Sequence, residues 1–373
     1  MPRVSLTFLW EIPARTAPIF SVFIPFFGCP RRCVFCSQHD QTGQQASPLD
    51  EILARAAADL RARHQQGRPP VELAFYGGTF TALAPRDMDA CLDMADSLLR
   101  DGCITRFRCS TRPDSLDTAL LARLRRHGCH TVELGIQSFS DTALQASERH
   151  YSGRQAAEAC RLVRGAGLAL GVQLLPGMPG HQPEDFLTDV RRALALGADM
   201  LRFYPCLVLA GTELARRWQQ GLYTPWPLPL TLSLLARGWL NARRAGVPVI
   251  RMGLAPEPGM EAALLAGPVD RSLGGRVLGR ALWLHVCACL LRAQGDEAAH
   301  SGIRAAALLD ALLVGGGDHA GLPRARALYL PRACQGFFRG PGDELGQAWK
   351  ALGITRRNLA WTAGQAACLH LDA

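Results

Sequence analysis

Lysine is almost absent from the sequence, and its scarcity excludes one class of nucleotide site. The phosphate-binding loop of P-loop proteins requires a G-x4-G-K-[ST] run, and the single lysine, Lys350, lies in no such context. The G-x-S-x-G elbow that carries the nucleophile of many serine hydrolases does not occur either. Phosphate-loop nucleotide hydrolysis and elbow-type acyl transfer are therefore excluded.

Long apolar runs are also missing. No uninterrupted apolar stretch reaches the ~20 residues that a membrane span needs. The start, Met1-Pro2-Arg3, lacks the charged head and apolar run of a secretory signal. We therefore expect a cytoplasmic protein that does not contact a membrane. With 48% hydrophobic and 20% charged residues among 373, the composition suits one large globular domain plus an appendage.

Positive charge is in excess, with 41 basic against 32 acidic residues. A basic surface is compatible with nucleic acid or phosphorylated ligands, whereas heavy arginine use also results from codon bias. Charge alone favours the second explanation. The 13 cysteines are odd in number and mostly stand singly in apolar segments, a pattern typical of thiols and metal ligands rather than disulfides.

Short apolar runs alternate with amphipathic stretches from Phe20 onward, which predicts parallel β/α units. We expect strands at 20–26, 71–76, 106–110, 131–136, 169–174, 200–204 and 247–252, with helices between them. Glycine and proline interrupt the pattern after Met252. The expected organisation is an N-terminal extension (1–17), a partial barrel (18–254) and a C-terminal extension (255–373) with a helical segment and a small α+β lobe.

Three cysteines follow the first predicted strand in a C-x3-C-x2-C triplet, Cys29, Cys33 and Cys36. Three thiolates at this spacing can ligate three irons of a 4Fe-4S cluster and leave the fourth iron open. An open iron can chelate the amino and carboxyl groups of S-adenosylmethionine, so that one electron breaks its C5'–S bond. The alternative is a structural zinc site, which normally needs a fourth ligand; His39 is the available candidate.

Further short sequence blocks lie at or after the later predicted strands. Each block is short, but their combination is highly specific for one protein family. They are Phe75-Tyr76-Gly77-Gly78-Thr79-Phe80-Thr81, Ser110-Thr111-Arg112-Pro113-Asp114, Glu133-Leu134-Gly135-Ile136-Gln137-Ser138, Pro176-Gly177-Met178-Pro179-Gly180, Arg202-Phe203-Tyr204-Pro205 and Gly211-Thr212-Glu213-Leu214. With the cysteine triplet, they resemble the Elongator-type branch of the radical SAM superfamily, in particular its short bacterial members without an acetyltransferase domain. The resemblance covers roughly residues 18 to 285 and implies a partial (β/α)6 radical SAM barrel.

The first strand ends are expected to bind the methionine part of the cofactor. Gly77 and Gly78 would let the ammonium group reach backbone carbonyls, unless they only form a tight turn. Thr79 stands where much of the superfamily has an acidic residue. Phe35, between the second and third cysteines, would pack on the adenine side; ordinary core packing is its alternative.

The later strand ends are expected to complete the cofactor site. Similarity to coproporphyrinogen dehydrogenase-like radical proteins implies that Ser110, Arg112 and Gln137 contact the ribose and the methionine carboxylate. Arg149, 12 residues after Gln137, would pair with that carboxylate through its guanidinium fork, unless it is a solvated charge at a helix end. Gln173 is a further candidate for the ribose hydroxyls.

Other polar and cysteine residues have weaker assignments. Glu133 and Tyr204 either orient substrate or serve packing. Cys109 and Cys206 end strands but, as single cysteines, are expected to behave as small apolar residues. Cys287 and Cys289 are two apart in a predicted helix and point away from each other, which argues against a second cluster.

The expected function is that of a radical SAM enzyme that forms a 5'-deoxyadenosyl radical and modifies an unidentified substrate. By resemblance, a tRNA base is the leading candidate, and the electron donor would be a flavodoxin or ferredoxin. The alternative is a non-catalytic iron-sulfur or zinc binding module on a barrel scaffold.

Overall fold

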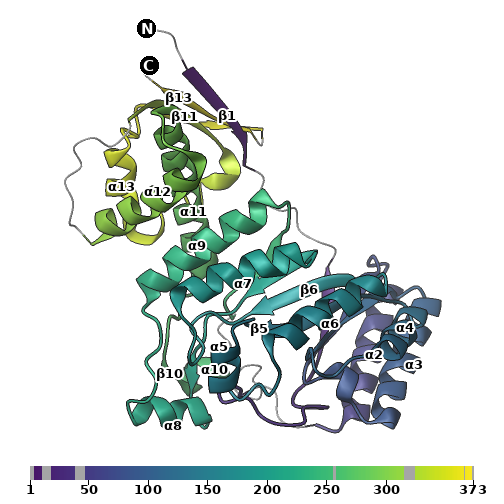
Figure 1. Cartoon of the computed structure of the whole chain (residues 1–373). Coiled ribbons are helices and arrows are strands. Elements are labelled where there is room, and N and C mark those ends of the chain that lie inside the picture. The colour runs from purple at the N-terminus through teal and green to yellow at the C-terminus, as the bar shows by residue number, and fades with distance from the viewer. Residues whose placement is uncertain are drawn as a thin grey trace. The chain divides into compact units, whose positions relative to one another are not determined.

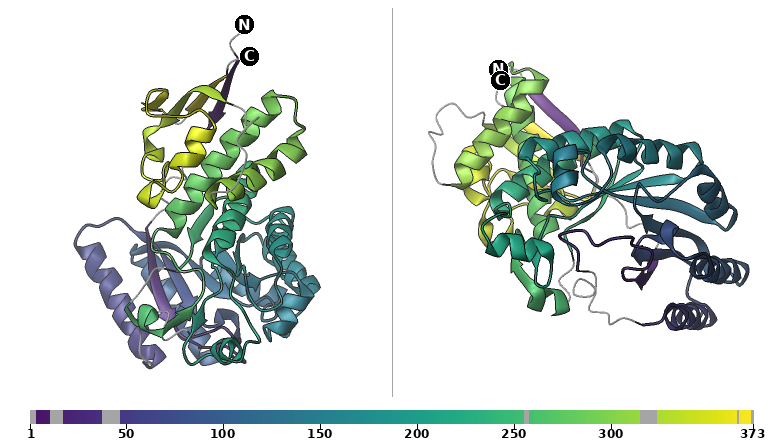
Figure 2. Two further views of the ribbon diagram at one scale, coloured as in Figure 1. Left: turned by 90° about the vertical axis from the view of Figure 1, so that its left-hand side faces the viewer. Right: turned by 60° about the horizontal axis from the view of Figure 1, so that its bottom comes forward.

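The structure is a computed structural model that describes residues 4–10, 18–37, 47–254, 258–314, 324–364 and 366–371 (Figures 1 and 2). The chain divides into two compact units. The barrel unit comprises Arg15–Thr231 and Asn241–Arg271, and the C-terminal unit comprises Met1–Ala14, Leu232–Leu240 and Ser272–Ala373. The boundary expected near residue 255 stays a prediction; the compact units themselves divide between Arg271 and Ser272.

The barrel unit is built on a seven-stranded sheet in which each neighbouring pair is parallel. In sheet order the strands are β2 (Ile19–Ile24), β3 (Val71–Gly77), β4 (Ile104–Thr111), β5 (Cys129–Gln137), β6 (Ala169–Leu174), β7 (Met200–Phe203) and β9 (Val249–Met252). This sheet confirms the partial barrel: six β/α units are followed by β9. Strands that are buried on both faces of a sheet consist of continuous apolar runs. The strands could therefore be predicted from such runs in the sequence.

Helices follow the strands and lie along the outer side of the sheet (Figures 1 and 2). They are α2 (Leu49–Gln65), α3 (Pro85–Arg100), α4 (Thr118–Arg126), α6 (Gly153–Gly165) and α7 (Pro183–Ala195). Three shorter helices, α5 (Asp141–Ala146), α8 (Glu213–Gln219) and α10 (Pro258–Ala263), lie in the connections. Helix α9 (Leu228–Arg244) is divided between the two units, because Leu232–Leu240 belongs to the C-terminal unit. A short 3-10 helix, Phe80–Ala82, and a two-stranded ribbon of β8 (Val208–Leu209) and β10 (Leu264–Ala266) complete the unit.

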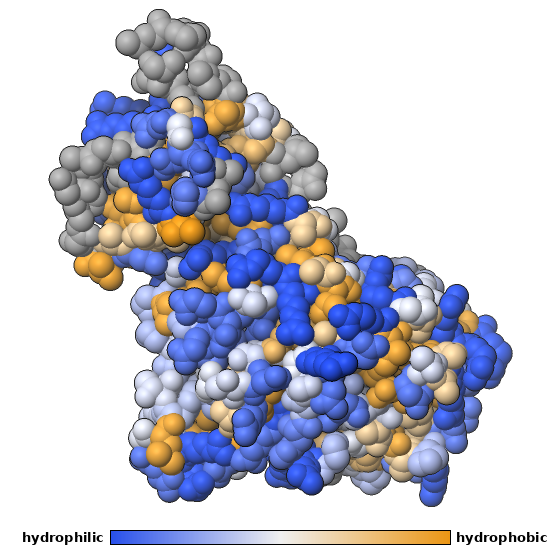
Figure 3. Space-filling model, in the orientation of Figure 1, coloured by the Kyte–Doolittle hydropathy of each residue, from blue (hydrophilic) through white to orange (hydrophobic). Residues whose placement is uncertain are grey.

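Local signals explain where several helices begin. The Asp117 side chain accepts a hydrogen bond from the backbone of Leu120, and Ser152 and Gln155 form a capping box at the start of α6. The outer faces carry the charged residues, and hydrophilic residues cover most of the surface in the view of Figure 3. The helices are therefore amphipathic. They cover the sheet but not the carboxyl ends of its strands, where other side chains can gather.

The C-terminal unit is the small α+β lobe that the sequence predicts. Its sheet has the order β1-β13-β11-β12, with β1 (Val4–Leu9), β11 (Ala325–Pro331), β12 (Leu359–Thr362) and β13 (Ala366–Leu371). Its helices are α11 (Leu273–Ala293), α12 (Ala298–Leu313) and α13 (Gly346–Ala351), with short 3-10 turns at Arg332–Cys334 and Pro341–Asp343. Strand β1 is an addition to the expectation, because the segment 1–17 was expected only as an extension.

Helix α11 is long and apolar enough, by length and composition, to cross a membrane. In its most apolar window, 67% of the helix is buried inside the protein. The core helix of a folded unit passes the same test, and α11 packs on α12 within the C-terminal unit.

Candidate functional site

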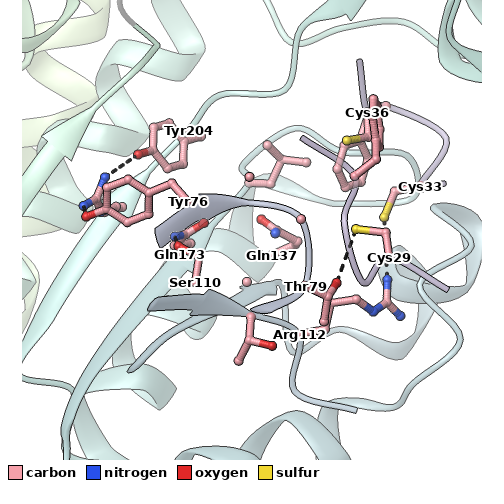
Figure 4. A pocket seen from close by; sticks show the side chains of 18 of the residues that line it. Cys29, Cys33, Cys36, Tyr76, Thr79, Ser110, Arg112, Gln137, Gln173 and Tyr204 are labelled. Atoms are coloured by element: carbon pink, nitrogen blue, oxygen red, sulfur yellow. Dashed lines mark hydrogen bonds between the residues drawn. The ribbon is translucent and has the colours of Figure 1, made fainter. Parts of the chain in front are cut away.

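A cavity of about 580 Å³ opens at the carboxyl ends of the strands in the barrel unit. All twelve residues predicted to bind the cluster or the cofactor line it: Cys29, Cys33, Phe35, Cys36, Gly77, Gly78, Thr79, Ser110, Arg112, Gln137, Arg149 and Gln173. Figure 4 shows the cysteines at one end, Tyr76 and Tyr204 at the other, and Gln137 between them. The structure thus brings the predicted residues together, while their individual roles stay predictions.

The cysteine loop leaves β2 and packs backbone to backbone against the end of β3. The Thr79 amide donates to the Phe27 carbonyl at 2.8 Å, and the Gly78 amide donates to the Ile24 carbonyl at 3.0 Å. A Cβ atom on Gly78 would lie 1.8 Å from the Phe27 carbonyl oxygen. The structure therefore gives a different reason for glycine here: the cysteine loop, rather than a ligand, occupies the space of the missing side chain.

The three cysteine side chains are half-buried at their end of the cavity. The Cys29 sulfur lies 3.3 Å from the Thr79 hydroxyl, and burial raises the pKa of the Cys29 thiol. Within the described ranges, no group of three or more His, Cys, Asp or Glu side chains is already gathered as a metal site. His39, the candidate fourth zinc ligand, lies outside the described residues.

Two guanidinium groups face the middle cysteine. Arg149 Nη1 donates to Cys33 Sγ at 2.8 Å, and Arg112 Nη1 lies 3.7 Å from the same sulfur. Positive charge beside a ligand sulfur offsets the negative charge of a thiolate-bound cluster. Three thiols on one loop with two cationic neighbours fit an iron-sulfur cluster with an open iron.

Arg149 is 4% exposed, so it is not a solvated charge at a helix end. Its Nε donates to the Tyr151 hydroxyl at 2.9 Å and its Nη2 to the Gly135 carbonyl at 2.6 Å. Burial acts to lower the pKa of Arg149, but Tyr151 and Cys33 more than offset this effect, and the pKa is raised overall. The guanidinium is therefore a fixed cation in the cavity wall.

Arg112 is bound to a carboxylate of its own chain. Its Nε and Nη2 donate to the two oxygens of Asp114 at 2.9 and 2.7 Å, a bidentate fork. Nη2 also donates to the Arg149 carbonyl at 2.7 Å. The fork of Arg112 is thus occupied by Asp114, and the expected contact of Arg112 with the ribose or the methionine carboxylate stays a prediction.

The middle of the cavity is lined by uncharged donors and acceptors. Gln173 Nε2 lies 3.3 Å from the Ser110 hydroxyl and 3.3 Å from a Glu133 carboxylate oxygen, so its amide oxygen remains available to a ligand. Gln137 ends β5 with a positive φ of 64°, which turns its backbone out of the strand. Both amides suit the hydroxyl groups of a ribose.

At the end of the cavity away from the cysteines, the lining residues contact a buried ionic network. The Glu133 carboxylate contacts Arg108 Nη1 at 3.0 Å and Arg202 Nε at 2.7 Å, and it accepts a hydrogen bond from the Tyr76 hydroxyl at 2.9 Å. Arg202 Nη1 donates to the Tyr204 hydroxyl at 2.9 Å. Tyr204 lines the cavity, whereas Glu133 lies behind it and supports the lining residues.

Several residues beside the site were not predicted from the sequence. Tyr76, Tyr151, Asp114 and Arg202 touch the predicted residues but were given no role of their own. Tyr76 ended a predicted strand, and Arg202 lay near the end of another, two residues before Tyr204; that position was the available signal. Among the single cysteines, Cys206 lines the cavity, whereas Cys109, Cys287 and Cys289 do not; Cys109 and Cys287 are buried, and Cys289 is half-buried.

Comparisons with known proteins agree with this geometry. Residues 23–193 match the radical SAM superfamily and residues 198–277 match the radical SAM C-terminal domain. The tRNA uridine(34) acetyltransferase of Dehalococcoides mccartyi is 31% identical over 241 residues, which are 56% of this chain and 52% of that protein. The heme chaperone HemW of Escherichia coli is 25% identical over 203 residues, 54% of each chain.

A solved structure shares the fold. The archaeal Elp3 of Methanocaldococcus infernus, truncated at its N-terminus, superposes with a TM-score of 0.54 at 20% identity, covering 71% of this chain and 62% of that one. The chain spans about half the length of the curated relatives it matches. Members of the matched superfamily bind a 4Fe-4S cluster and S-adenosylmethionine. The chain therefore belongs to the radical SAM superfamily, and its resemblance to the Elongator-type branch is confirmed.

Proposed function

We propose that this protein is a radical S-adenosylmethionine enzyme whose cluster is held by Cys29, Cys33 and Cys36. When bound, the cluster supplies the electron that splits S-adenosylmethionine into methionine and a 5'-deoxyadenosyl radical. The observation that carries the proposal is the cavity itself: one end holds the cysteine triplet and two arginines, and its walls hold the amides and glycines expected for the cofactor.

The residues of this chain would divide the work along the cavity. Arg149 would hold the methionine carboxylate, because its Nη1 and Nη2 each carry a second N–H besides those given to Cys33 and Gly135. Gln137 and Gln173 would hold the ribose, and Phe35 would contact the adenine. The end beyond Gln173, lined by Tyr76, Tyr204 and Arg202, is left for the substrate.

A tRNA base is the proposed substrate, supported by the names of relatives that modify tRNA uridine. The far end of the cavity is suited to a polar ring. Tyr204 accepts from Arg202 and keeps its own hydroxyl proton to donate, and Gln173 keeps its amide oxygen to accept. The electron donor would be a flavodoxin or ferredoxin, and a cytoplasmic location belongs to the same proposal.

The alternative is a non-catalytic iron-sulfur module. Similarity to proteins named heme chaperones favours it, since such a protein need not turn over S-adenosylmethionine. Both proposals share the cluster and differ only in cofactor cleavage. One experiment therefore separates them.

The test is anaerobic reconstitution with iron and sulfide, followed by dithionite and S-adenosylmethionine. We expect about four irons per chain, absorbance near ~400 nm, and release of 5'-deoxyadenosine measured by chromatography. Cys33→Ala should lose the cluster and the product. Cys160→Ala, which removes a buried thiol in α6 that does not line the cavity, should retain both. A cluster without 5'-deoxyadenosine would support the binding module, and no cluster in the parent would contradict both.

A further inference from the structure

Three acceptors fix the orientation of the Arg149 guanidinium. Its Nε, Nη2 and Nη1 donate to the Tyr151 hydroxyl, the Gly135 carbonyl and the Cys33 sulfur at 2.9, 2.6 and 2.8 Å. The group is planar and rigid, so it cannot turn without losing at least one of these bonds. The Tyr151 and Gly135 acceptors therefore direct Nη1 toward Cys33.

Tyr151 is itself held in place. Its hydroxyl lies 2.8 Å from the Ile136 carbonyl and 3.0 Å from the Gly135 carbonyl, to which it can donate. Its ring lies beneath two guanidinium groups, 5.0 Å from Arg149 and 5.5 Å from Arg112. One buried tyrosine thus contacts both cations that face Cys33.

The end of β5 provides the carbonyl acceptors. The register between β5 and β6 shifts between Leu134 and Gln137, and Gln137 adopts a positive φ. Such an irregularity takes backbone groups out of the sheet ladder and redirects them, often beside an active site. The carbonyls of Gly135 and Ile136 are consequently free to accept from Arg149 and Tyr151.

The segment that carries Arg149 is strained on both sides. Glu148 and His150 have φ values of 54° and 58°, in the left-handed region that residues with a Cβ rarely adopt. Strain of this kind persists only where surrounding contacts impose it. The backbone here is shaped to bring the Arg149 side chain, rather than a neighbour, into the cavity wall.

We propose that Tyr151 is a positioning residue that holds Arg149 against Cys33 and, through this N–H···S hydrogen bond, sets the reduction potential of the cluster. The inference rests on the proposed function for Cys33 as a cluster ligand. Hydrogen bonds to cluster sulfurs are among the factors that set such potentials. A cationic donor on a ligand sulfur stabilises the reduced, more negative cluster, so it raises the potential.

The test is a redox titration of the reconstituted full chain, without S-adenosylmethionine, followed by electron paramagnetic resonance of the reduced cluster. Tyr151→Phe keeps the ring but removes the hydroxyl that accepts from Arg149 Nε. We expect parental iron and sulfide content and a more negative midpoint potential. The matched control is Tyr223→Phe, which removes a buried hydroxyl that donates to Gly177 at 2.7 Å, and which should leave the potential unchanged.

A second variant tests whether Tyr151 acts through Arg149. Arg149→Lys keeps the charge but has a single nitrogen in place of the three nitrogens that donate in fixed directions to Tyr151, Gly135 and Cys33, so it should also make the potential more negative. Adding Tyr151→Phe to Arg149→Lys should then cause little further shift, because the two residues form one unit. If Tyr151→Phe shifted the midpoint potential equally in the parent and in the Arg149→Lys variant, the inference would be overturned.

Two further outcomes count against it. An unchanged potential in Tyr151→Phe would overturn the inference directly. Loss of the cluster from Tyr151→Phe would do so as well, because a residue that only orients Arg149 leaves assembly intact. A parent protein that takes up no iron would instead contradict the proposed function, and iron analysis before the titration separates the two failures.

Discussion

At the scale of single residues, Glu133 is a buried carboxylate that depends on several charged and polar partners. Its carboxylate is 1% exposed, and it lies between Arg108 and Arg202 while also accepting from Tyr76. Arg108 in turn contacts Glu72 at 2.6 Å. Removing one charge from such a network leaves its partners buried without compensation.

Glu133→Gln should therefore lower the free energy of unfolding by about 3 kcal/mol or more. The amide still fits but cannot balance two guanidinium charges. Urea titration of the apo-protein measures the loss. The matched control is Glu158→Gln, whose exposed pair with Arg161 should change the free energy by less than about 1 kcal/mol. A loss of unfolding free energy of similar size in both variants would show that the buried Glu133 network stabilises the fold no more than an exposed ion pair does.

At the scale of elements, the cysteine loop and the end of β3 form one packed unit. A Cβ on Gly28 would lie 2.2 Å from the Thr79 carbonyl, and one on Gly78 would lie 1.8 Å from the Phe27 carbonyl. Both atoms in the way are backbone atoms, which cannot move aside as a flexible side chain would. The glycines thus allow the loop to approach the strand.

Gly78→Ala should displace the cysteine loop and reduce iron binding, rather than weaken only the cofactor. Iron and sulfide content after reconstitution measures this effect. Gly165→Ala is the control, because a Cβ at that position in α6 meets nothing within 4 Å and alanine favours a helix by about 1 kcal/mol over glycine. Full cluster content in Gly78→Ala with weakened S-adenosylmethionine binding would restore the role of Gly78 as a ligand approach site.

The elements themselves could be predicted because their signals are local. Each strand of the barrel sheet is a short apolar run, and polar residues at its carboxyl end meet at one edge of a parallel sheet. That rule, together with the family resemblance, predicted that Cys29, Ser110, Gln137 and Gln173 surround one cavity. The irregular end of β5 and the role of Tyr151 could not be predicted in this way, because they depend on the register between β5 and β6.

At the scale of the whole molecule, non-local pairing limited what the sequence could predict. Strand β1 pairs antiparallel with β13, so that Val4 meets Leu371 across almost the whole chain. A short apolar stretch near an end has no local signal for such a partner. The two units are therefore not successive segments of the chain, because the first strand belongs to the C-terminal unit.

An ion cluster makes the stability of the C-terminal unit depend on pH. Burial acts to raise the pKa of Glu344, but hydrogen bonds from Arg280 and Arg276 of α11 outweigh it and hold the pKa below its usual value. A carboxyl with a lowered pKa in the folded state stabilises the fold above its unfolded pKa, near 4.5. This contribution is lost as the pH falls through the folded pKa.

The parent should therefore be more stable than Glu344→Gln at neutral pH, and the difference should shrink below about pH 4.5. Denaturant titrations of both proteins between pH 7 and pH 3 measure it. A difference that stays constant over this range would mean that Glu344 acts by shape or hydrogen bonding alone.

Trp10 connects the first strand to the interior of the C-terminal unit and offers the most direct test of the division into two units. The ring is 1% exposed and lies 5.3 Å from Trp239 and 5.7 Å from His285, measured between ring centroids. Removing a buried tryptophan side chain costs about 3 to 5 kcal/mol, because contacts are lost and a cavity remains.

Trp10→Ala should therefore raise amide exchange by roughly 100-fold in β13 and α11, since about 3 kcal/mol corresponds to two factors of ten. Hydrogen exchange with mass spectrometry resolves these peptides. Peptides from β3 to β6 should exchange at the parental rate, and the iron content after reconstitution should be unchanged, because Trp10 groups with the other unit. Faster exchange throughout both units would mean that they unfold as one body. Unchanged exchange in β13 would show that β1 contributes little to its sheet.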